Sequence, residues 1–263
     1  MTRLGDAARG VLLTRDPHDK RRAARSLARA WRRGEIAHSC DAAMPDRPAW
    51  PATPELLAPA QMPRRRKGGS ERGRIAMIHA LAHIEFVAID LAVDLVGRFG
   101  GGFPRAFVDD WLGVAADEAM HFALLDRRLR ALGSHYGALP AHAGLWEAAE
   151  ATADDALARL AIVPMVLEAR GLDVTPATVA RFRSVGDESS ARILDRIYAD
   201  EIRHVSAGTR WFEWLCDERR VEPQATWQTL VKSRFRGSLK APFNDSARRD
   251  AGLTQEYYAV IAS

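Results

Sequence analysis

The sequence predicts an all-α protein built around an up-down-up-down four-helix bundle, with an N-terminal arm and a C-terminal extension. Three observations predict this fold. Apolar residues recur at helical spacing through most of the chain, with almost no β-type alternation. Glycine and proline breaks divide this stretch into long helices at about 71–98, 104–132, 146–170 and 187–217. The motif Ala-Asp-Glu-x-x-His occurs twice, once in the second helix and once in the fourth.

The predicted helices divide the chain into three regions. Residues 1–70 form a basic, proline-rich arm, 71–217 form the bundle, and 218–263 form an extension that packs on it. A basic helix is expected at about 20–33. The prolines between 45 and 63 favour extended chain, which we expect to wrap the domain and to cover a site.

The third helix is the least regular of the four. Pro164 lies inside it and predicts a kink. The stretch from Gly171 to Pro176 is expected to end this helix, and a short helix at about 176–184 should precede the fourth. A further helix is expected near 222–232 in the extension.

Composition narrows the class of protein. Hydrophobic residues make up 47% of the chain, which excludes disorder throughout. No stretch approaches about 20 uninterrupted apolar residues, and the first residues lack the apolar core of a secretory signal, so we expect a cytoplasmic protein without a membrane span. Cys40 and Cys216 match no CxxC pattern and are expected to be reduced thiols.

Positive charge is concentrated near the N-terminus. The net charge is +4, and segment 14–33 and the run Arg64, Arg65, Arg66 and Lys67 are strongly basic. This pattern is typical of a solvated surface. It would also attract RNA or an anionic substrate, although no aromatic RNA-binding motif accompanies it.

The repeated motif carries the candidate chemistry. Glu118 and His121 lie three residues apart, as do Glu201 and His204, so each pair shares one helix face. A further glutamate precedes each motif glutamate by 33 residues, Glu85 in one case and Glu168 in the other. Two antiparallel hairpins would bring these side chains to the middle of a bundle, which is the ligand arrangement of two-metal carboxylate bundles.

The glutamates lie on the apolar stripes of their helices rather than on wet faces, although the stripe around Glu168 is weaker. Buried carboxylates require a compensating charge, and metal ions would supply it. We therefore assign Glu85, Glu118, Glu168 and Glu201 as catalytic, and these four with His121 and His204 as metal ligands. Oxygen and nitrogen ligands without cysteine favour two iron ions, with manganese as the alternative, over structural zinc.

Four neighbours are candidates to support the ligands. We expect Asp117 to orient His204 and Asp200 to orient His121, the alternative being surface carboxylates. Tyr198 either packs or approaches the metals, with packing favoured. Arg170 suits an ion pair near the site, an anionic substrate or the surface.

Two further histidines lie on another face of the first long helix. His79 and His83 point away from Glu85, together with Asp90 and Asp94. We expect them to anchor the arm or another helix rather than to bind metal.

Several segments resemble a bacterial family of ferritin-like proteins over roughly 45–255. They are HALAHIEFVAIDLAVD (79–94), ADEAMHFALL (116–125), VLEARGLDVTP (166–176), DEIRHV (200–205) and PFNDSARRDAGL (242–253). The ligand helices, including LEAR, are also distantly similar to the di-iron monooxygenase that hydroxylates a modified tRNA base. The resemblance implies a ferritin-like bundle, a carboxylate-bridged di-iron centre and O₂-dependent chemistry.

We therefore expect a di-iron or di-manganese O₂-activating oxidase or monooxygenase, with O₂ and an unidentified substrate as its partners. The electron donor and the oligomeric state stay open, a homodimer included. The alternatives are a ferroxidase or other iron-handling protein, an RNA-associated hydroxylase, and a non-catalytic protein with a relic site.

Overall fold

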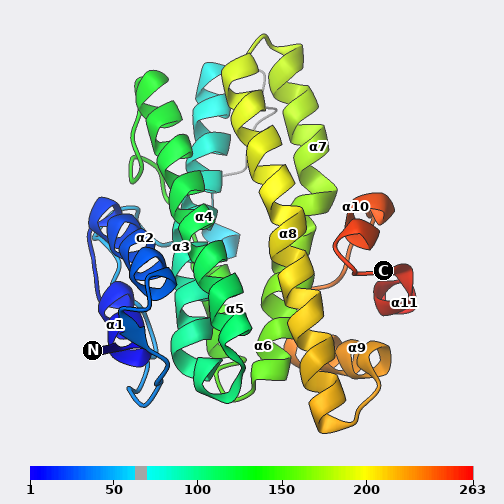
Figure 1. The fold of residues 1–263 in the computed structure, drawn as a ribbon. Coiled ribbons are helices and arrows are strands. Elements are labelled where there is room, and N and C mark those ends of the chain that lie inside the picture. Colours follow the sequence, from blue (N-terminus) through cyan, green and yellow to red (C-terminus); the bar gives the residue numbers. More distant parts are fainter. Residues whose placement is uncertain (63–69, 263) are drawn as a thin grey trace. The chain divides into compact units, whose positions relative to one another are not determined.

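The structure is a computed structural model that describes residues 1–62 and 70–262, and these are mainly helical (Figure 1). The chain forms two compact units. Unit 1 comprises Met1–Glu147 and Arg181–Ile193, and unit 2 comprises Ala148–Ala180 and Leu194–Ser263. These units cut across the predicted division into arm, bundle and extension. The basic run at 64–67 lies outside the described residues.

The all-α class is confirmed. The only strands in the described part of the chain are β1 (Thr2–Arg3) and β2 (Ile36–Ala37), which pair in parallel with Thr2 opposite Ile36. Unit 1 contains the helices α1 (Leu4–Leu12), α2 (Pro17–Arg32), α3 (Glu71–Phe99) and α4 (Arg105–Ala131), and the short 3-10 helices η1 (Pro59–Gln61) and η2 (Gly100–Gly102). The helices α5 (Gly144–Glu150), α7 (Ala169–Ser184) and α8 (Glu188–Arg219) contribute to both units.

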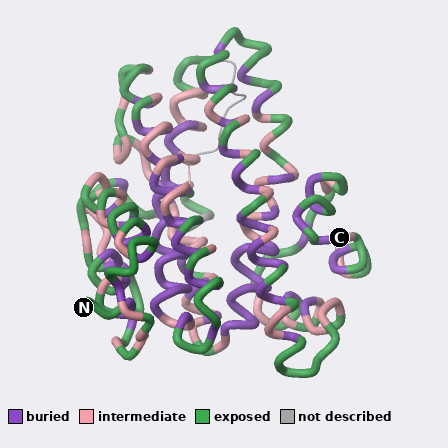
Figure 2. The backbone as a smooth tube through the Cα atoms, in the orientation of Figure 1, coloured by how far each residue is buried: buried purple, intermediate pink, exposed green. Residues whose placement is uncertain are grey.

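The hairpin of α3 and α4 forms the core of unit 1, and its limits match the predicted first and second helices closely. The Ser70 side chain caps α3 by accepting a hydrogen bond from the Gly73 N–H at 3.2 Å. Helix α3 carries a continuous buried run over 85–97, and α4 carries buried residues at helical spacing; Figure 2 shows buried residues in purple. Phe86 on α3 packs against Phe122 on α4 with 5.6 Å between the ring centroids, and Phe107 and Trp111 on α4 are almost fully buried. This apolar packing fixes the positions of the buried side chains on the hairpin.

By length and composition, α3 could cross a membrane. Its most apolar stretch has a mean hydropathy of 1.7, but 67% of that stretch is buried inside the protein. A central helix of a folded domain has the same properties, so this finding is weak support for a span.

Unit 1 also contains the N-terminal segment. Asp16 caps α2 by accepting from the Asp19 N–H at 2.9 Å, and Pro17 follows at the first helical position. The basic helix therefore begins earlier than its predicted start at about 20. Sequence reasoning missed α1, although Leu4, Ala8, Val11 and Leu12 are buried at helical spacing.

The proline-rich segment is extended within unit 1, as predicted, over its described residues. The Ala49 N–H donates to the Leu12 carbonyl at 2.8 Å. Leu57 N–H donates to the Ala141 carbonyl at 2.8 Å, and Ala141 N–H donates to the Glu55 carbonyl at 2.9 Å. Backbone bonds of this kind hold a chain that prolines keep out of a helix.

Unit 2 contains most of the third helix, which is made of α6 (Ala156–Ile162), the π-helical turn η3 (Val163–Glu168) and α7. It also contains α9 (Pro223–Arg234), α10 (Asp245–Asp250) and α11 (Gln255–Tyr258). The prediction of α9 is confirmed. The predicted limits of the third helix are wrong at both ends. At its start the chain is not helical between α5 and α6, and at its end the helix continues past Gly171.

Pro176 does not end the third helix, because another group replaces the hydrogen bond it cannot make. A helical residue in this place would donate its N–H to the carbonyl of Leu172, but proline has no N–H. The Asn244 side chain donates to that carbonyl at 3.1 Å. Helix α7 therefore runs through Pro176 to Ser184, and the separate helix expected at 176–184 is its last part.

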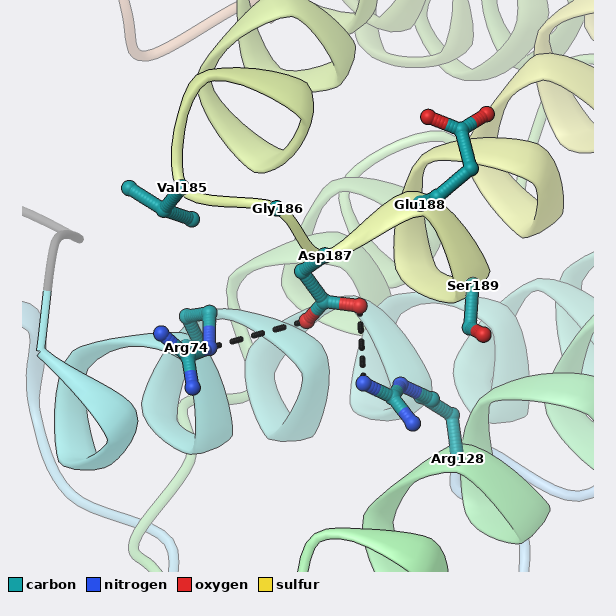
Figure 3. A pocket seen from close by; sticks show the side chains of 7 residues that line it. All are labelled: Arg74, Arg128, Val185, Gly186, Asp187, Glu188 and Ser189. Carbon is teal, nitrogen blue, oxygen red and sulfur yellow. Dashed lines mark hydrogen bonds and ion pairs between the residues drawn. The ribbon is translucent and has the colours of Figure 1, made fainter.

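Two arginines hold the start of α8 within unit 1 (Figure 3). Arg128 donates to Asp187 at 2.7 Å and to the Ser190 hydroxyl at 2.9 Å, and Arg74 lies 3.6 Å from the other oxygen of Asp187. Asp187 also accepts from the Ser190 N–H at 3.0 Å, which caps the helix. These groups line an open pocket of about 220 Å³. We regard it as a structural ion cluster, because its carboxylate is already bound.

Candidate metal centre

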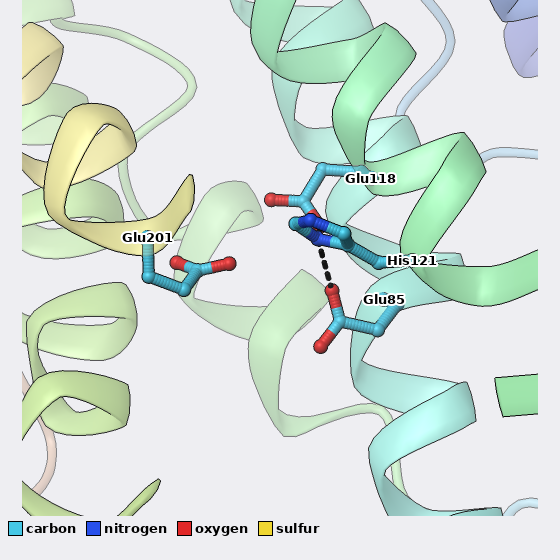
Figure 4. Close-up of side chains that lie close together, drawn as sticks. All are labelled: Glu85, Glu118, His121 and Glu201. Carbon is cyan, nitrogen blue, oxygen red and sulfur yellow. Dashed lines mark hydrogen bonds and ion pairs between the residues drawn. The ribbon is translucent and has the colours of Figure 1, made fainter. Parts of the chain in front are cut away.

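Three of the predicted ligands meet in unit 1. Glu85 comes from α3, and Glu118 and His121 come from α4 (Figure 4). The His121 Nδ1 lies 3.2 Å from Glu85 Oε2 and 3.3 Å from Glu118 Oε2. Each of the three offers a ligand atom within 4.8 Å of the others, and all are buried, so the group could hold a metal ion.

The pKa values of Glu85 and His121 show how the cluster distributes its charge without a metal ion. Burial raises the pKa of Glu85 well above its ordinary value, the charge of Glu118 raises it further, and the hydrogen bond to His121 opposes both. Burial lowers the pKa of His121, but its hydrogen bonds to Glu118 and Glu85 outweigh burial and raise it to about 11. Without a metal ion, a proton on His121 therefore supplies part of the missing positive charge.

Unit 2 contains the second Glu-x-x-His pair with nearly the same local geometry. Glu201 Oε1 lies 3.4 Å from His204 Nδ1 on α8, against 3.3 Å between Glu118 and His121 on α4. Glu201 is 9% exposed and His204 is 1% exposed. The helix itself sets this geometry, since residues three apart lie on one face. Figure 4 also labels Glu201.

Glu168 is the last residue of the π-helical turn η3. A π turn adds one residue to a helical turn and often occurs at functional sites. Pro164 stands at its start, where the expected kink of the third helix takes the form of this turn. The Glu168 side chain is half-buried, while its Oε2 atom is inaccessible to solvent.

A glycine on α8 makes room for the π turn within unit 2. A Cβ atom at Gly208 would lie 2.4 Å from the Cβ of Pro164, which is closer than such atoms approach. The glycine therefore lets the helix that carries Glu201 pack directly against the turn that carries Glu168. Sequence reasoning identified the kink but missed the role of Gly208.

Asp117 and Asp200, the aspartates predicted to orient the ligand histidines, differ in burial. Asp200 is buried and accepts from Arg196 at 2.7 Å and also from Arg203, both on its own helix. Asp117 is half-buried on α4. The predicted pairings of Asp117 with His204 and of Asp200 with His121 would join the two units and remain predictions.

Tyr198 and Arg170 both contact the C-terminal extension. The Tyr198 hydroxyl accepts from the Asn244 side chain at 2.9 Å, which agrees with the packing role favoured for it. Arg170 donates to the Lys240 carbonyl at 2.8 Å and to Asp173 at 3.3 Å. These contacts explain Arg170 as an anchor of the extension, rather than as a partner of Glu168.

His79 and His83 anchor a loop, as their position on another face of α3 indicated. His79 Nε2 accepts from the Gly137 N–H at 2.9 Å. His83 Nε2 lies 3.2 Å from the His142 carbonyl, so it carries the proton, and His83 Nδ1 accepts from the Tyr136 hydroxyl at 2.9 Å. The two histidines fix the segment after α4, and the His83 ring also packs edge-on against Trp50 of the arm, with 6.2 Å between the ring centroids.

The residues present fit a metal ion. Carboxylate and imidazole ligands are those that iron and manganese accept, and Glu85, Glu118 and His121 offer both types within a buried group. The arrangement can therefore bind metal and keep it away from bulk water.

Comparison with known proteins agrees with a single family along the chain. Residues 13–259 match the family described as "Protein of unknown function (DUF455)". The chain is also 43% identical over 213 residues to an uncharacterised protein of Haemophilus influenzae, which covers 79% of this chain and 74% of that protein. No solved structure matches the chain. The chain therefore belongs to the DUF455 family of proteins of unknown function.

Proposed function

We propose that this protein is an O₂-activating two-metal oxidase or monooxygenase. The metals are two iron ions, with manganese as the alternative. In this proposal unit 1 supplies Glu85, Glu118 and His121, and unit 2 supplies Glu168, Glu201 and His204. The ferritin-like four-helix bundle that would hold these six ligands is the one expected from the sequence.

The observation that carries the proposal is the repeated half-site. Each half has a Glu-x-x-His pair whose carboxylate and imidazole lie 3.3 Å apart in one case and 3.4 Å in the other. Each also has a glutamate 33 residues upstream of its motif. Two equivalent sets of ligands suit two equivalent ions.

The chain's own groups have separable roles in this chemistry. A pair of iron ions, when bound, supplies electrons to O₂ at positions that the protein leaves open. The glutamates hold the positive charge, and burial of Glu85 and Glu118 excludes water. His121 must release the proton that the metal-free site retains at Nδ1 before that nitrogen can become a ligand.

Metal content and oxygen consumption test the proposal together. The protein is loaded anaerobically with ferrous iron, desalted and analysed, and then exposed to O₂ while oxygen uptake is recorded. We expect about two iron ions per chain and uptake of O₂. Glu118→Ala and His204→Ala remove one ligand from different halves, and each should lower both the iron content and the uptake.

The same measurement separates the alternatives. Retention of hundreds of iron ions per chain after aerobic loading would indicate an iron store rather than a catalyst. A folded protein that binds no metal under anaerobic loading would support a relic site and contradict the proposal. Glu147→Gln, at an exposed position on α5, provides a matched control that should bind iron normally.

A further inference from the structure

One face of α2 carries a row of arginines that the metal centre does not use. Arg22, Arg25, Arg29 and Arg32 are exposed and lie three or four residues apart, so they share one side of the helix. We call this row the arginine face. Segment 14–33 contains eight Lys or Arg and two Asp, a net charge of +6, whereas the whole chain has +4. The remainder of the chain is therefore net negative, and the positive charge is localised.

Outside the arginine face, internal contacts use part of this charge, because Lys20 is buried against Asp90 and Arg33 pairs with Glu35. The arginine face itself is used less. Arg22 pairs with Asp19, and Arg29 donates to the Ser26 hydroxyl at 3.0 Å. Within residues 1–62 and 70–262, Arg25 and Arg32 have no acidic partner within ion-pair distance. Surface arginines that are not needed for folding are available to an external anion.

We propose that the arginine face binds the phosphate backbone of a single-stranded nucleic acid. The row spans ten residues, or about 15 Å of helix. A flexible strand can follow a straight row of that length and place about three phosphates against it, whereas a rigid duplex touches a convex helix over only a short arc. Arginine is suited to this contact because its guanidinium donates two parallel hydrogen bonds to a phosphate.

The buried side of α2 argues for a nucleic acid over a lipid surface. A helix that binds a membrane keeps its apolar side exposed for insertion. Here Ala24, Leu27, Ala28 and Trp31 are buried within unit 1, where α2 packs against α4 and α3. Trp31 is fully buried, so it cannot stack on a base. We therefore expect contacts with phosphates that are independent of base sequence.

Fluorescence anisotropy with a labelled 12-nucleotide oligouridylate tests this inference on the full chain. With three phosphate contacts on a single strand, affinity should fall about 20-fold between 50 and 200 mM salt. The triple variant Arg25→Gln/Arg29→Gln/Arg32→Gln should bind at least tenfold more weakly at 50 mM salt and lose most of the salt dependence. Its thermal unfolding is measured in parallel, because these exposed side chains should contribute little to stability.

A matched variant and two competing ligands decide the outcome. Arg181→Gln/Arg183→Gln/Arg192→Gln removes the same charge from other exposed positions of unit 1 and should leave binding unchanged. Equal losses in both triple variants, or no binding of the oligonucleotide at 50 mM salt, would overturn the inference. Stronger binding to anionic vesicles or to a 12-base-pair duplex than to the single strand would also overturn it. Iron content is unaffected in either case, so this test is independent of the proposed metal centre.

Discussion

Both faces of α3 bury carboxylates, but they neutralise them in different ways. On the face toward the arm, Asp90 accepts from the Lys20 ammonium at 2.6 Å and from the Trp50 indole N–H at 2.8 Å. On the face toward α4, Glu85 meets His121 and a second carboxylate, Glu118. Within the described part of the chain, Glu85 has no Lys or Arg partner. A buried acid with its own cation is structural, whereas one without a cation is suited to an external ion.

The pKa values of Asp90 and Glu85 are both raised, but the neighbouring charges act on them in opposite ways. Burial raises the pKa of Asp90 to about 6, while the charge and hydrogen bonds of Lys20 limit the rise. Burial also raises the pKa of Glu85, and Glu118 adds to it. Burial is common to both faces, so the neighbouring charge is what separates a structural acid from a candidate ligand.

The largest effect is expected from removing the structural cation. Lys20→Met leaves Asp90 buried with an uncompensated charge, which should cost about 3–5 kcal/mol of unfolding free energy. Urea denaturation at pH 7.5 measures the loss. The double variant Lys20→Met/Asp90→Asn removes both charges and should recover more than half of it. A loss below about 1 kcal/mol in the single variant would show that Asp90 needs no internal cation, and the comparison of the two faces would fail.

The second largest loss of stability is expected from crowding the π turn η3. This turn distinguishes the half-site of unit 2 from the regular helices of unit 1. Gly208→Ala forces a methyl group against Pro164 and should cost about 1–3 kcal/mol. It should also lower iron retention, because the turn that carries Glu168 must move. Gly171→Ala is the control, since a Cβ there meets open space and should be neutral or stabilising. Similar losses in both variants would indicate helix disruption alone.

A pH effect of up to about 2 kcal/mol is expected from His79. Burial lowers its pKa from 6.5 to about 4, with the neighbouring His135 as a lesser cause, so the folded protein keeps it neutral while the unfolded chain protonates it. The contribution of neutral His79 to the unfolding free energy should therefore be fully present above pH 6.5 and decrease as the pH falls toward 4. His79→Gln retains an acceptor for the Gly137 N–H and should reduce this dependence in urea titrations at pH 5 and 7, while His83, whose pKa burial also lowers to about 4, keeps its own share. An unchanged slope would assign the effect to other groups.

The smallest expected change has the opposite sign. Glu85→Gln removes one of the two buried carboxylates that share the positive charge of His121, so the metal-free protein should become more stable by about 1 kcal/mol. Iron content should fall at the same time. Glu147→Gln makes the same substitution at an exposed position and should change neither quantity. Destabilisation of the metal-free protein by Glu85→Gln would show that the carboxylate serves the fold.

Local patterns were sufficient to predict α3, α4 and α8, which carry all the candidate ligands except Glu168. The apolar period and the Gly100–Gly102 break define α3 and α4 closely, because both signals depend on neighbours along the chain. The spacing of Glu118 and His121 predicted their proximity for the same reason. The course of the third helix could not be predicted, since the group that compensates Pro176 is Asn244, about 70 residues away.

Sequence alone determined that two Glu-x-x-His pairs lie on long helices, because helical geometry follows from residue spacing. Tertiary structure decided which buried acids have a cation of their own: the partner of Asp90 lies 70 residues earlier, at Lys20 on α2. It also decided that Arg170 and Tyr198 contact the extension. Such pairings depend on which surfaces pack together, and packing is set by the complete apolar core rather than by any local pattern.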